Sequence, residues 1–377
     1  MNHVLDVLVI GGGQSGLASG YHLKQRGLSF LILEASGEAA GSWPNYYDSL
    51  KLFSPAKYSS LPGLSIPSPG DRYPNRDEVV QYLKNYASYF QLPIVFHQRV
   101  EQVSKESGVF QIRTTTGETY TARNVICATG SFNKPYIPSI QGQEDFKGTI
   151  VHSAFYKTPD AFRDQSVIVV GRGNSAVQIA MELADIAHTT LAVRELVSLV
   201  PQRFLGKDIH FWFIITGIDS RWRIGRSLAN ASSVMDLDGY KQRLKDGNPK
   251  QKIMFTSFYE DGVIWPDGSK EKVDSVIFAT GFRSNLPFIK DLGGLDANGD
   301  PLQDRGVSTV VSGLYYVGLS GQRSFASATR AKPAINDSRS PWAVYTFECA
   351  DGWLRGAKAL LIQFVQLSLH MYKIRVL

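Results

Sequence analysis

Cysteine is scarce in this sequence, and its scarcity excludes two kinds of redox chemistry. The 377 residues include two cysteines, Cys127 and Cys349, which lie far apart and form no C-x-x-C pair. Neither a disulfide framework nor a dithiol redox centre can be built from them. Such cysteine usage suits a reducing compartment, so we expect a cytoplasmic protein.

Long apolar runs are also absent. The first residues, Met1 to Asp6, lead directly into the strand-like run Val7 to Ile10, which leaves no room for an export signal. Near the other end, Ala357 to Val365 is interrupted by Lys358 and Gln363 and is much shorter than the roughly 18 to 20 residues that span a bilayer. We therefore expect no association with a membrane.

Two further classes of partner lack a signal. The net charge is +6, yet no long Lys/Arg run with interleaved aromatic residues is present, so we expect no nucleic-acid partner. The seven histidines are scattered without metal-ligand spacing, and we interpret His22, His188 and His210 as helix or loop residues. No metal site is predicted.

What the sequence does contain is an internal repeat. An apolar strand, a glycine turn and an amphipathic helix over Val7 to Leu23 are echoed in the same register over Val167 to Leu183. Each copy continues into a second apolar strand, Phe30 to Leu33 and Thr190 to Val193. The repeat predicts an α/β protein with two Rossmann-like dinucleotide-binding domains.

A second echo closes each half of the chain. Asn124 to Gly130 and Ser275 to Gly281 are both apolar strands that end in Ala-Thr-Gly. A hairpin with its turn at Thr116-Gly117 precedes the first of these strands. Asn75 and Glu78 resemble a capping box, which predicts a helix that ends near Phe90.

The first glycine loop has the pattern that binds the pyrophosphate of a dinucleotide. Gly11, Gly13 and Gly16 allow a tight turn, close approach of the backbone to phosphate and helix-strand packing, while the helix N-terminus stabilises the negative charge. Glu34 follows about 20 residues after the loop, where a carboxylate accepts hydrogen bonds from ribose hydroxyls. The alternative is a glycine turn with a purely structural role.

The second loop, Gly171 to Ala176, is the same device with alanine at its third fixed position. Its second strand is followed by Arg194 rather than by an acid, and a cation there favours the 2′-phosphate of NADPH. An arginine that is merely solvated at a strand end is the open alternative. Two loops in one chain imply two dinucleotides, and hydride transfer from a nicotinamide to a flavin is the chemistry that pairs them most directly.

These features together resemble a known family. The first loop, Gly41-Ser-Trp43, both Ala-Thr-Gly strands and the string Phe146-x-Gly148-x-x-x-His152-x-x-x-Tyr156 resemble the flavin-containing, class B monooxygenases. The sequence further resembles bacterial flavin monooxygenases of arsenic-resistance operons. The similar segments are Tyr47-Asp-Ser-Leu50, Phe53-Ser-Pro55, Pro201-Gln-Arg203 and Gly321 to Thr329. The resemblance covers residues 1 to about 329.

The resemblance implies a mechanism and a set of site residues. FAD is reduced by NADPH and reacts with O2, and a C4a-peroxyflavin transfers one oxygen to a small nucleophile with a soft N, S or arsenical centre. Ser54 stands where relatives often carry an asparagine near the flavin, and is the one candidate for a catalytic role. The predicted cofactor-binding residues are Gly11, Gly13, Gln14, Ser15, Gly16, Glu34, Ala35, Gly41, Ser42, Trp43, Ala128, Thr129, Gly130, His152, Gly171, Gly173, Asn174, Ser175, Ala176, Arg194, Thr280 and Gly281.

The same reasoning divides the chain into parts. We expect a first part of an FAD-binding domain at 1–157, an NADPH-binding domain at 158–282 and a return to the FAD-binding domain at 283–329. The remaining 330–377 does not follow the family pattern, and we expect a short helix at Ala357 to Leu367 and weaker FAD binding as a result.

Two other functions stay open on the sequence. An NADPH oxidase or flavin reductase would pass electrons to oxygen or a partner without oxygenating a substrate. A nucleotide-binding sensor would use the same loops without catalysis. We expect a small-molecule substrate and O2 as partners, and leave a homodimer open.

Overall fold

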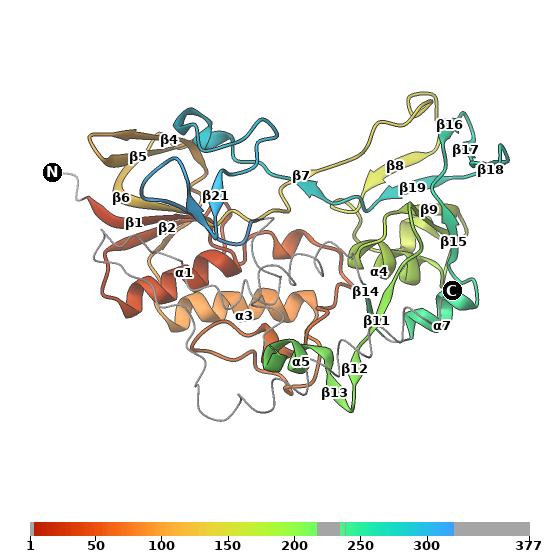
Figure 1. Ribbon diagram of the computed structural model, residues 1–377, viewed down its shortest axis with the longest axis horizontal. Helices are drawn as coiled ribbons and strands as arrows, with labels where there is room; N and C mark the ends of the chain where they lie inside the picture. Colours follow the sequence, from red (N-terminus) through yellow and green to blue (C-terminus); the bar gives the residue numbers. More distant parts are fainter. Residues whose placement is uncertain (1–3, 217–233, 238, 320–377) are drawn as a thin grey trace.

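The computed structural model describes residues 4–216, 234–237 and 239–319. The divergent stretch 330–377, with the helix expected at 357–367, lies outside these residues. Figure 1 shows two sheet-centred units side by side, each with helices against its sheet.

The first unit is built on a nine-stranded sheet in which β21-β22-β23-β6-β1-β2-β3 run side by side and β5 and β4 extend from β6. The segment from β23 through β6, β1 and β2 to β3 is parallel. The strands are β1 (Leu5–Ile10), β2 (Phe30–Leu33), β3 (Ile94–Val95), β4 (Val100–Glu106), β5 (Val109–Thr114), β6 (Thr119–Cys127), β21 (Gln303–Asp304), β22 (Val307–Ser308) and β23 (Leu314–Tyr316).

Both faces of this sheet are buried, which explains why Val7 to Ile10 of β1 is a continuous apolar run. Val7 and Val9 belong to the core under α1 (Gln14–Gln25) and α3 (Arg76–Tyr89). Leu8 and Ile10 point to the other face and pack in a second core with residues of β5 and β6. A parallel strand covered on both faces is expected to read as a continuous apolar run.

The capping box predicted at the start of α3 is confirmed. The Asn75 side chain accepts a hydrogen bond from the Glu78 backbone N–H, and the Glu78 side chain accepts one from the Asn75 backbone. The helix ends at Tyr89, with Phe90 as its C-cap. The hairpin predicted after it is β5 paired antiparallel with β6.

The second unit has a five-stranded parallel sheet in the order β15-β10-β9-β19-β8. Its strands are β8 (Thr149–His152), β9 (Ser166–Val170), β10 (His188–Val193), β15 (Lys250–Ile253) and β19 (Ser275–Phe278), and its main helix is α4 (Asn174–Leu183). Since β23 follows this unit in sequence and pairs with β6 in the first sheet, the second unit is inserted in the first, as predicted.

One strand lies in a different unit from the one expected. β8 falls within the 1–157 stretch assigned to the first domain, but it pairs with β19 in the second sheet. Parallel pairing joins residues far apart in sequence, so the apolar pattern alone could not assign this strand to a sheet.

Shorter elements complete the structure. β7 (Lys134–Pro135) pairs antiparallel with β20 (Phe282–Arg283). The chain passes from the first unit to the second through β7 and returns through β20 (Figure 1). The second unit also carries β11 (Leu199–Pro201), β12 (Arg203–Phe204), β13 (Lys207–Asp208), α5 (Ile209–Thr216), β14 (Val234–Asp236), α7 (Tyr240–Lys245), β16 (Ser257–Tyr259), β17 (Gly262–Ile264) and β18 (Lys270–Lys272). The remaining helices are α2 (Ala56–Ser59) and the 3-10 turns η1 (Trp43–Asn45), η2 (Asp160–Phe162) and η4 (Pro287–Leu292).

A loop of the first unit is hydrogen-bonded to α4 of the second. The Tyr47 hydroxyl donates to Gln178 Oε1 at 2.8 Å, and Gln178 Nε2 donates to the Lys51 carbonyl at 3.3 Å. The Ser49 hydroxyl donates to Glu182 Oε2 at 2.9 Å. These bonds fix the position of α4, and with it the second glycine loop, relative to the first unit.

Candidate active site

The first glycine loop packs against the Ala-Thr-Gly turn at the end of β6. Gly11 has φ +106, and a Cβ there would lie 2.6 Å from the Ala128 carbonyl oxygen. Only glycine tolerates both that backbone conformation and that approach. The loop therefore lies directly on the turn made by Ala128, Thr129 and Gly130.

A second glycine contact brings the Gly41-Ser42-Trp43 segment onto the same loop. Gly41 has φ +57, and a Cβ there would lie 2.8 Å from the Gly13 Cα. From this segment the Trp43 indole N–H donates to Gln14 Oε1 at 3.2 Å, at the first residue of α1. The segment thus covers the N-terminus of the helix.

The start of α1 has the properties of a phosphate site. Gly13 is its N-cap, and no side chain among the described residues caps the helix. The first backbone N–H groups of a helix have no partner within the helix, and they attract anions. Gln14, Ser15 and Gly16 form this first turn, so the residues present fit a dinucleotide pyrophosphate.

Glu34 is buried at the end of β2 beside the loop. Its Oε2 accepts a hydrogen bond from the Gly12 backbone N–H at 2.6 Å, and its Oε1 accepts from the Ser36 backbone N–H at 2.8 Å and hydroxyl at 2.9 Å. Ala35 lies between Glu34 and Ser36 in the turn. A carboxylate has about four acceptor sites, so Glu34 retains capacity for a ribose hydroxyl while it orders the loop.

The second glycine loop repeats this construction in the second unit. Gly171 has φ +142, and a Cβ there would lie 2.5 Å from the Ala279 carbonyl oxygen, next to Thr280 and Gly281. Gly173 is the N-cap of α4, whose first turn contains Asn174, Ser175 and Ala176. The two loops therefore place two helix N-termini at the carboxyl ends of parallel strands, one in each sheet.

Two arginines and one acid lie at the edge of this second loop. Arg194 directly follows β10 and is exposed. Arg172, inside the loop, forms an ion pair with Glu195. The cation predicted to read a 2′-phosphate thus has a cationic neighbour, and that neighbour is paired with an acid.

His152 uses both ring nitrogens on the backbone. Its Nδ1 accepts a hydrogen bond from the Ala154 N–H at 3.1 Å, so Nε2 carries the proton and donates to the Gly281 carbonyl at 2.9 Å. Burial lowers the pKa of His152, although the bond to Gly281 works in the other direction. The imidazole is a neutral group that holds the Thr280-Gly281 turn beside β8.

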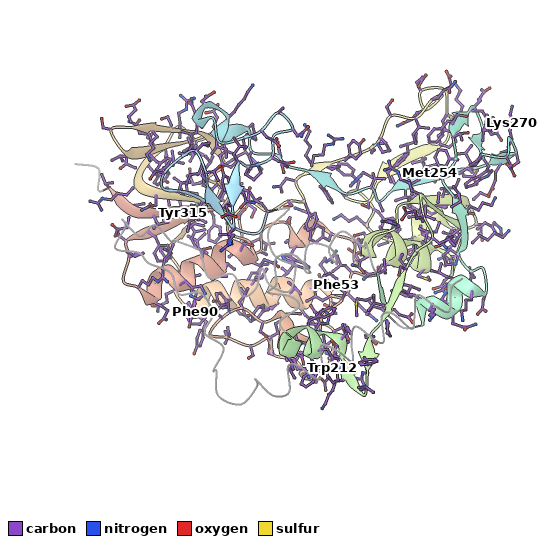
Figure 2. The ribbon with its side chains drawn as sticks, viewed as in Figure 1. Phe53, Phe90, Trp212, Met254, Lys270 and Tyr315 are labelled. Atoms are coloured by element: carbon purple, nitrogen blue, oxygen red, sulfur yellow. The ribbon has the colours of Figure 1, made fainter. Side chains whose placement is uncertain are left out.

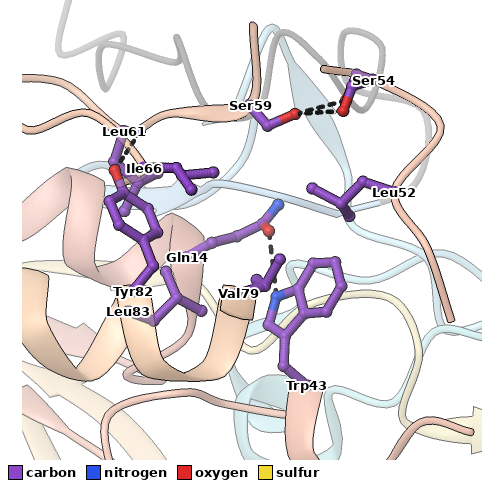
Figure 3. A pocket seen from close by; sticks show the side chains of 10 residues that line it. All are labelled: Gln14, Trp43, Leu52, Ser54, Ser59, Leu61, Ile66, Val79, Tyr82 and Leu83. Atoms are coloured by element: carbon purple, nitrogen blue, oxygen red, sulfur yellow. Dashed lines mark hydrogen bonds between the residues drawn. The ribbon is translucent and has the colours of Figure 1, made fainter. Parts of the chain in front are cut away.

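Ser54 lies in the wall of a small pocket above Gln14 and Trp43 (Figure 3). Its hydroxyl lies 2.7 Å from the Ser59 hydroxyl, and Ser59 Oγ also donates to the Ser54 and Pro55 carbonyls at 3.1 and 3.0 Å. Since a hydroxyl has one proton, Ser54 donates to Ser59 when Ser59 donates to a carbonyl. The remaining lining residues are Leu52, Leu61, Ile66, Val79, Tyr82 and Leu83.

Sequence reasoning missed a cluster next to this wall. His210, which we interpreted as a helix or loop residue, is buried with its Nδ1 2.8 Å from Asp208 Oδ1, and the Tyr73 hydroxyl donates to Asp208 Oδ2. The signal available was an acid and a histidine two residues apart. The cluster is completed by Tyr73, which is 135 residues from Asp208 in sequence and so could not be linked to it by spacing.

Residues 4–216, 234–237 and 239–319 contain no metal site, membrane-spanning helix or exposed cysteine. No group of three or more His, Cys, Asp or Glu side chains there is arranged to hold a metal ion. No helix in these ranges is long and apolar enough to cross a bilayer. Cys127 is fully buried within β6, and burial raises the pKa of its thiol; Cys349 lies outside these ranges.

The chain is similar to several known proteins over most of its length. A family model described as pyridine nucleotide-disulphide oxidoreductase matches residues 8–200. A CzcO-like oxidoreductase of Geobacillus kaustophilus is 38% identical over 331 residues, covering 87% of this chain and 94% of that protein. A probable indole-3-pyruvate monooxygenase of Arabidopsis thaliana, YUCCA7, is 30% identical, covering 89% and 88%.

The chain is also similar to solved structures of flavin monooxygenases. The structure of a flavin-containing monooxygenase from Stenotrophomonas maltophilia superimposes with a TM-score of 0.76 at 34% identity, and covers 88% of this chain and 96% of that one. The fold, the two glycine loops and these relatives agree with the resemblance drawn from the motifs. This chain is an oxidoreductase that belongs to the flavin-dependent monooxygenase family.

Proposed function

We propose that this protein is an NADPH- and FAD-dependent monooxygenase that oxygenates a small molecule with a soft nucleophilic N, S or arsenical centre. The observation that carries the proposal is the paired construction of Gly11 to Gly16 and Gly171 to Ala176, each packed on an Ala-Thr-Gly turn. The overall reaction consumes NADPH, H⁺, O2 and substrate, and yields NADP⁺, water and the oxygenated product.

FAD is assigned to the first unit. Gly13 and Gly41 leave a surface without side chains over the α1 N-terminus, Glu34 would accept from the ribose, and Trp43 with Gln14 would border the isoalloxazine. When bound, FAD accepts a hydride from the nicotinamide and activates O2. In this proposal Ala35, Ser42 and the Ala128 to Gly130 turn contribute the backbone around the cofactor.

NADPH is assigned to the second unit. The α4 N-terminus would hold its pyrophosphate, and exposed Arg194 supplies the charge that a 2′-phosphate requires. His152 would act indirectly, since both of its ring nitrogens already hold backbone groups. The proposed NADPH-binding domain therefore begins with β8, before residue 158.

The pocket at Ser54 has a volume of about 30 Å³, room for about one or two water molecules, so it would border a small neutral substrate rather than enclose it. Most of its lining is aliphatic or aromatic, and Gln14, Ser54 and Ser59 are the polar exceptions. Within the hydrogen-bond pattern described above, Ser54 Oγ is left with acceptor capacity toward the pocket. The chain's contribution would be to position the substrate and exclude water, and a side-chain general base is not required.

Two competing functions predict different stoichiometry. An NADPH oxidase or flavin reductase would reduce O2 or an electron acceptor and leave the organic molecule unchanged. A sensor would bind nucleotide without flavin reduction. We propose the cytoplasm as the location, with the substrate and O2 as partners; a homodimer remains a hypothesis for sedimentation analysis.

The test is a coupled assay on the purified flavoprotein. NADPH consumption, O2 uptake, hydrogen peroxide and oxygenated product are measured together with a thioether, a tertiary amine and a trivalent arsenical. One product per NADPH with any of the three supports the proposal. Hydrogen peroxide equal to NADPH with all of them would identify an oxidase, and unreduced flavin would favour the sensor.

A further inference from the structure

Asp208 is a buried carboxylate that the dinucleotide sites leave unexplained. Glu34 and Asp208 are the acidic side chains that are buried among the described residues, and Glu34 belongs to the first glycine loop. Taking a carboxylate out of water costs several kcal/mol, and a buried pair often adds nothing to stability over apolar residues. A buried acid paired with histidine beside a pocket is instead a typical feature of functional sites.

The contacts of Asp208 tie three segments together. Oδ1 accepts from the His210 backbone N–H at 2.8 Å and lies 2.8 Å from its Nδ1. Oδ2 accepts from the Tyr73 hydroxyl, which comes from the loop before α3. Burial alone would raise the pKa of Asp208, but the hydrogen bonds from His210 and Tyr73 outweigh this effect. The pKa is lowered overall, so the carboxylate is ionised at neutral pH.

The His210 ring stacks with two aromatic side chains of the first unit. The Phe53 and Tyr58 rings are 6.4 and 6.1 Å from it between centroids, each inclined by 26°. The Phe213 ring of α5 meets its edge at 5.8 Å. Figure 2 labels Phe53 on the side of the first unit that faces α5. The segment β13–α5 of the second unit thus reaches back to the first.

Phe53 and Tyr58 are the immediate neighbours of the two pocket serines. Ser54 follows Phe53, Ser59 follows Tyr58, and their hydroxyls are 2.7 Å apart. A shift of either ring therefore moves one of these serines relative to Gln14 and Trp43 on the opposite side of the pocket (Figure 3). A series of interactions thus links Asp208 through His210 to the Phe53 and Tyr58 rings, whose next residues are the pocket serines.

We propose that Asp208 and His210 are positioning residues for the substrate side of the pocket, and that they fix the wall at residues 53–59 through the Phe53 and Tyr58 rings. This inference rests on the proposed function, in which the pocket wall borders the substrate. It also narrows the substrate class to compact apolar molecules with one soft heteroatom, because the wall it fixes is largely apolar.

The experiment measures binding without turnover. Methyl phenyl sulfide is titrated into the oxidised flavoprotein, and its dissociation constant is read from changes in the flavin visible spectrum. The variants are Asp208→Asn, which removes the charge at constant size, and His210→Gln, which keeps an N–H donor but removes the ring. Asp6→Asn is the matched control, because Asp6 also accepts bonds from Ser29 and Arg123 but lies near the start of β1, at the opposite end of that strand from the first glycine loop.

We expect both variants to weaken probe binding about tenfold. Asp208→Asn loses a charge-assisted hydrogen bond, and His210→Gln loses the ring that stacks with Phe53 and Tyr58. Flavin content and the rate of flavin reduction by NADPH are expected to stay within about twofold, and Asp6→Asn to match the wild type. If Asp208→Asn does not fold, Tyr73→Phe removes only one bond to the same carboxylate, and is expected to weaken binding about threefold.

Three results would overturn the inference. These are unchanged probe affinity in the variants, a parallel fall in probe affinity, flavin content and reduction rate, or no saturable spectral change in the wild type. Failure of the proposed function looks different. Intact probe binding with hydrogen peroxide in place of sulfoxide would refute oxygenation, while the binding data would still decide the role of Asp208 and His210.

Discussion

Arg172, within the second glycine loop, forms an ion pair with Glu195. Glu195 directly follows Arg194, the residue that is expected to bind a 2′-phosphate. Both side chains are accessible to solvent, so the pair contributes little to stability and exchanges partners readily. In the proposed NADPH site, a 2′-phosphate would meet Arg194 and would compete with Glu195 for Arg172. Glu195 also presents the kind of carboxylate that accepts from the free 2′-hydroxyl of NADH.

Neutralising this acid should therefore shift coenzyme preference. We expect Glu195→Gln to raise the ratio of kcat/KM for NADPH over NADH roughly three- to tenfold, because a competing charge is removed from Arg172. Stopped-flow flavin reduction with each coenzyme measures the ratio. The control is Asp185→Asn, which breaks a similarly exposed carboxylate pair with Arg243. A ratio that moves equally in both variants would contradict the assignment.

Arg194→Ala tests the phosphate contact itself. A guanidinium-phosphate pair in a partly exposed site contributes on the order of 1.5 to 3 kcal/mol, so NADPH use should fall roughly ten- to a hundredfold. NADH use should barely change, because NADH lacks the phosphate. If the ratio is unchanged in Arg194→Ala but falls in Arg172→Ala, the guanidinium inside the loop is the one that reads the phosphate.

Gly13 and Gly173 form a matched pair of N-cap positions. Around Gly13, a Cβ would meet the Gly41 Cα at 3.5 Å, and around Gly173 it would meet no described atom within 4 Å. Valine at either site should leave the fold intact but obstruct the phosphate approach. We expect Gly13→Val to purify without flavin, and Gly173→Val to retain flavin but reduce it slowly with NADPH. Absorption spectra measure the flavin content of each variant, and stopped-flow kinetics measure the rate of its reduction by NADPH. Full flavin occupancy in Gly13→Val would refute the FAD assignment.

His152 predicts a pH dependence of stability. Its pKa in the folded protein is lowered from the ordinary value of 6.5, so the unfolded chain binds more protons as the pH falls through that value. The contribution of His152 is present above pH 6.5 and is lost as the pH decreases toward the folded pKa, with a slope of at most about 1.4 kcal/mol per pH unit.

Replacing His152 with asparagine should flatten that dependence. Urea unfolding of wild type and His152→Asn between roughly pH 5 and 7 gives the free energy of unfolding at each pH. We expect a shallower slope in the variant, together with lower stability at pH 7 from the lost bond to Gly281. Parallel slopes would show that His152 does not titrate on unfolding as its burial implies.

Much of the fold followed from local sequence signals. The strand at Phe30–Leu33 has the predicted bounds, and the capping box at Asn75 and Glu78 forms as expected. These features depend on a few neighbouring residues, and the internal repeat supplied the relation between the two units. The fold class was therefore within reach of the sequence.

Features that depend on pairing between residues far apart in the chain could not be predicted from the sequence. β8 joins the second sheet through β19, which lies more than a hundred residues later in the chain. The histidine at 210 gains significance from Tyr73 and Asp208 together, and its spacing matches no metal motif. Likewise, the Arg172–Glu195 pair bridges two segments that the pattern of glycines and strands treats separately.

The pairing of β7 with β20 has a consequence for how such proteins can be rearranged. Pro135 lies opposite Phe282 and Lys134 lies opposite Arg283, so the chain leaves and re-enters the first unit at points about 5 Å apart. An insertion whose two ends are adjacent adds a whole module without separating the flanking strands. The second unit could thus be exchanged for a homologous one by cutting at these two strands, which makes this site the natural junction for chimeric enzymes.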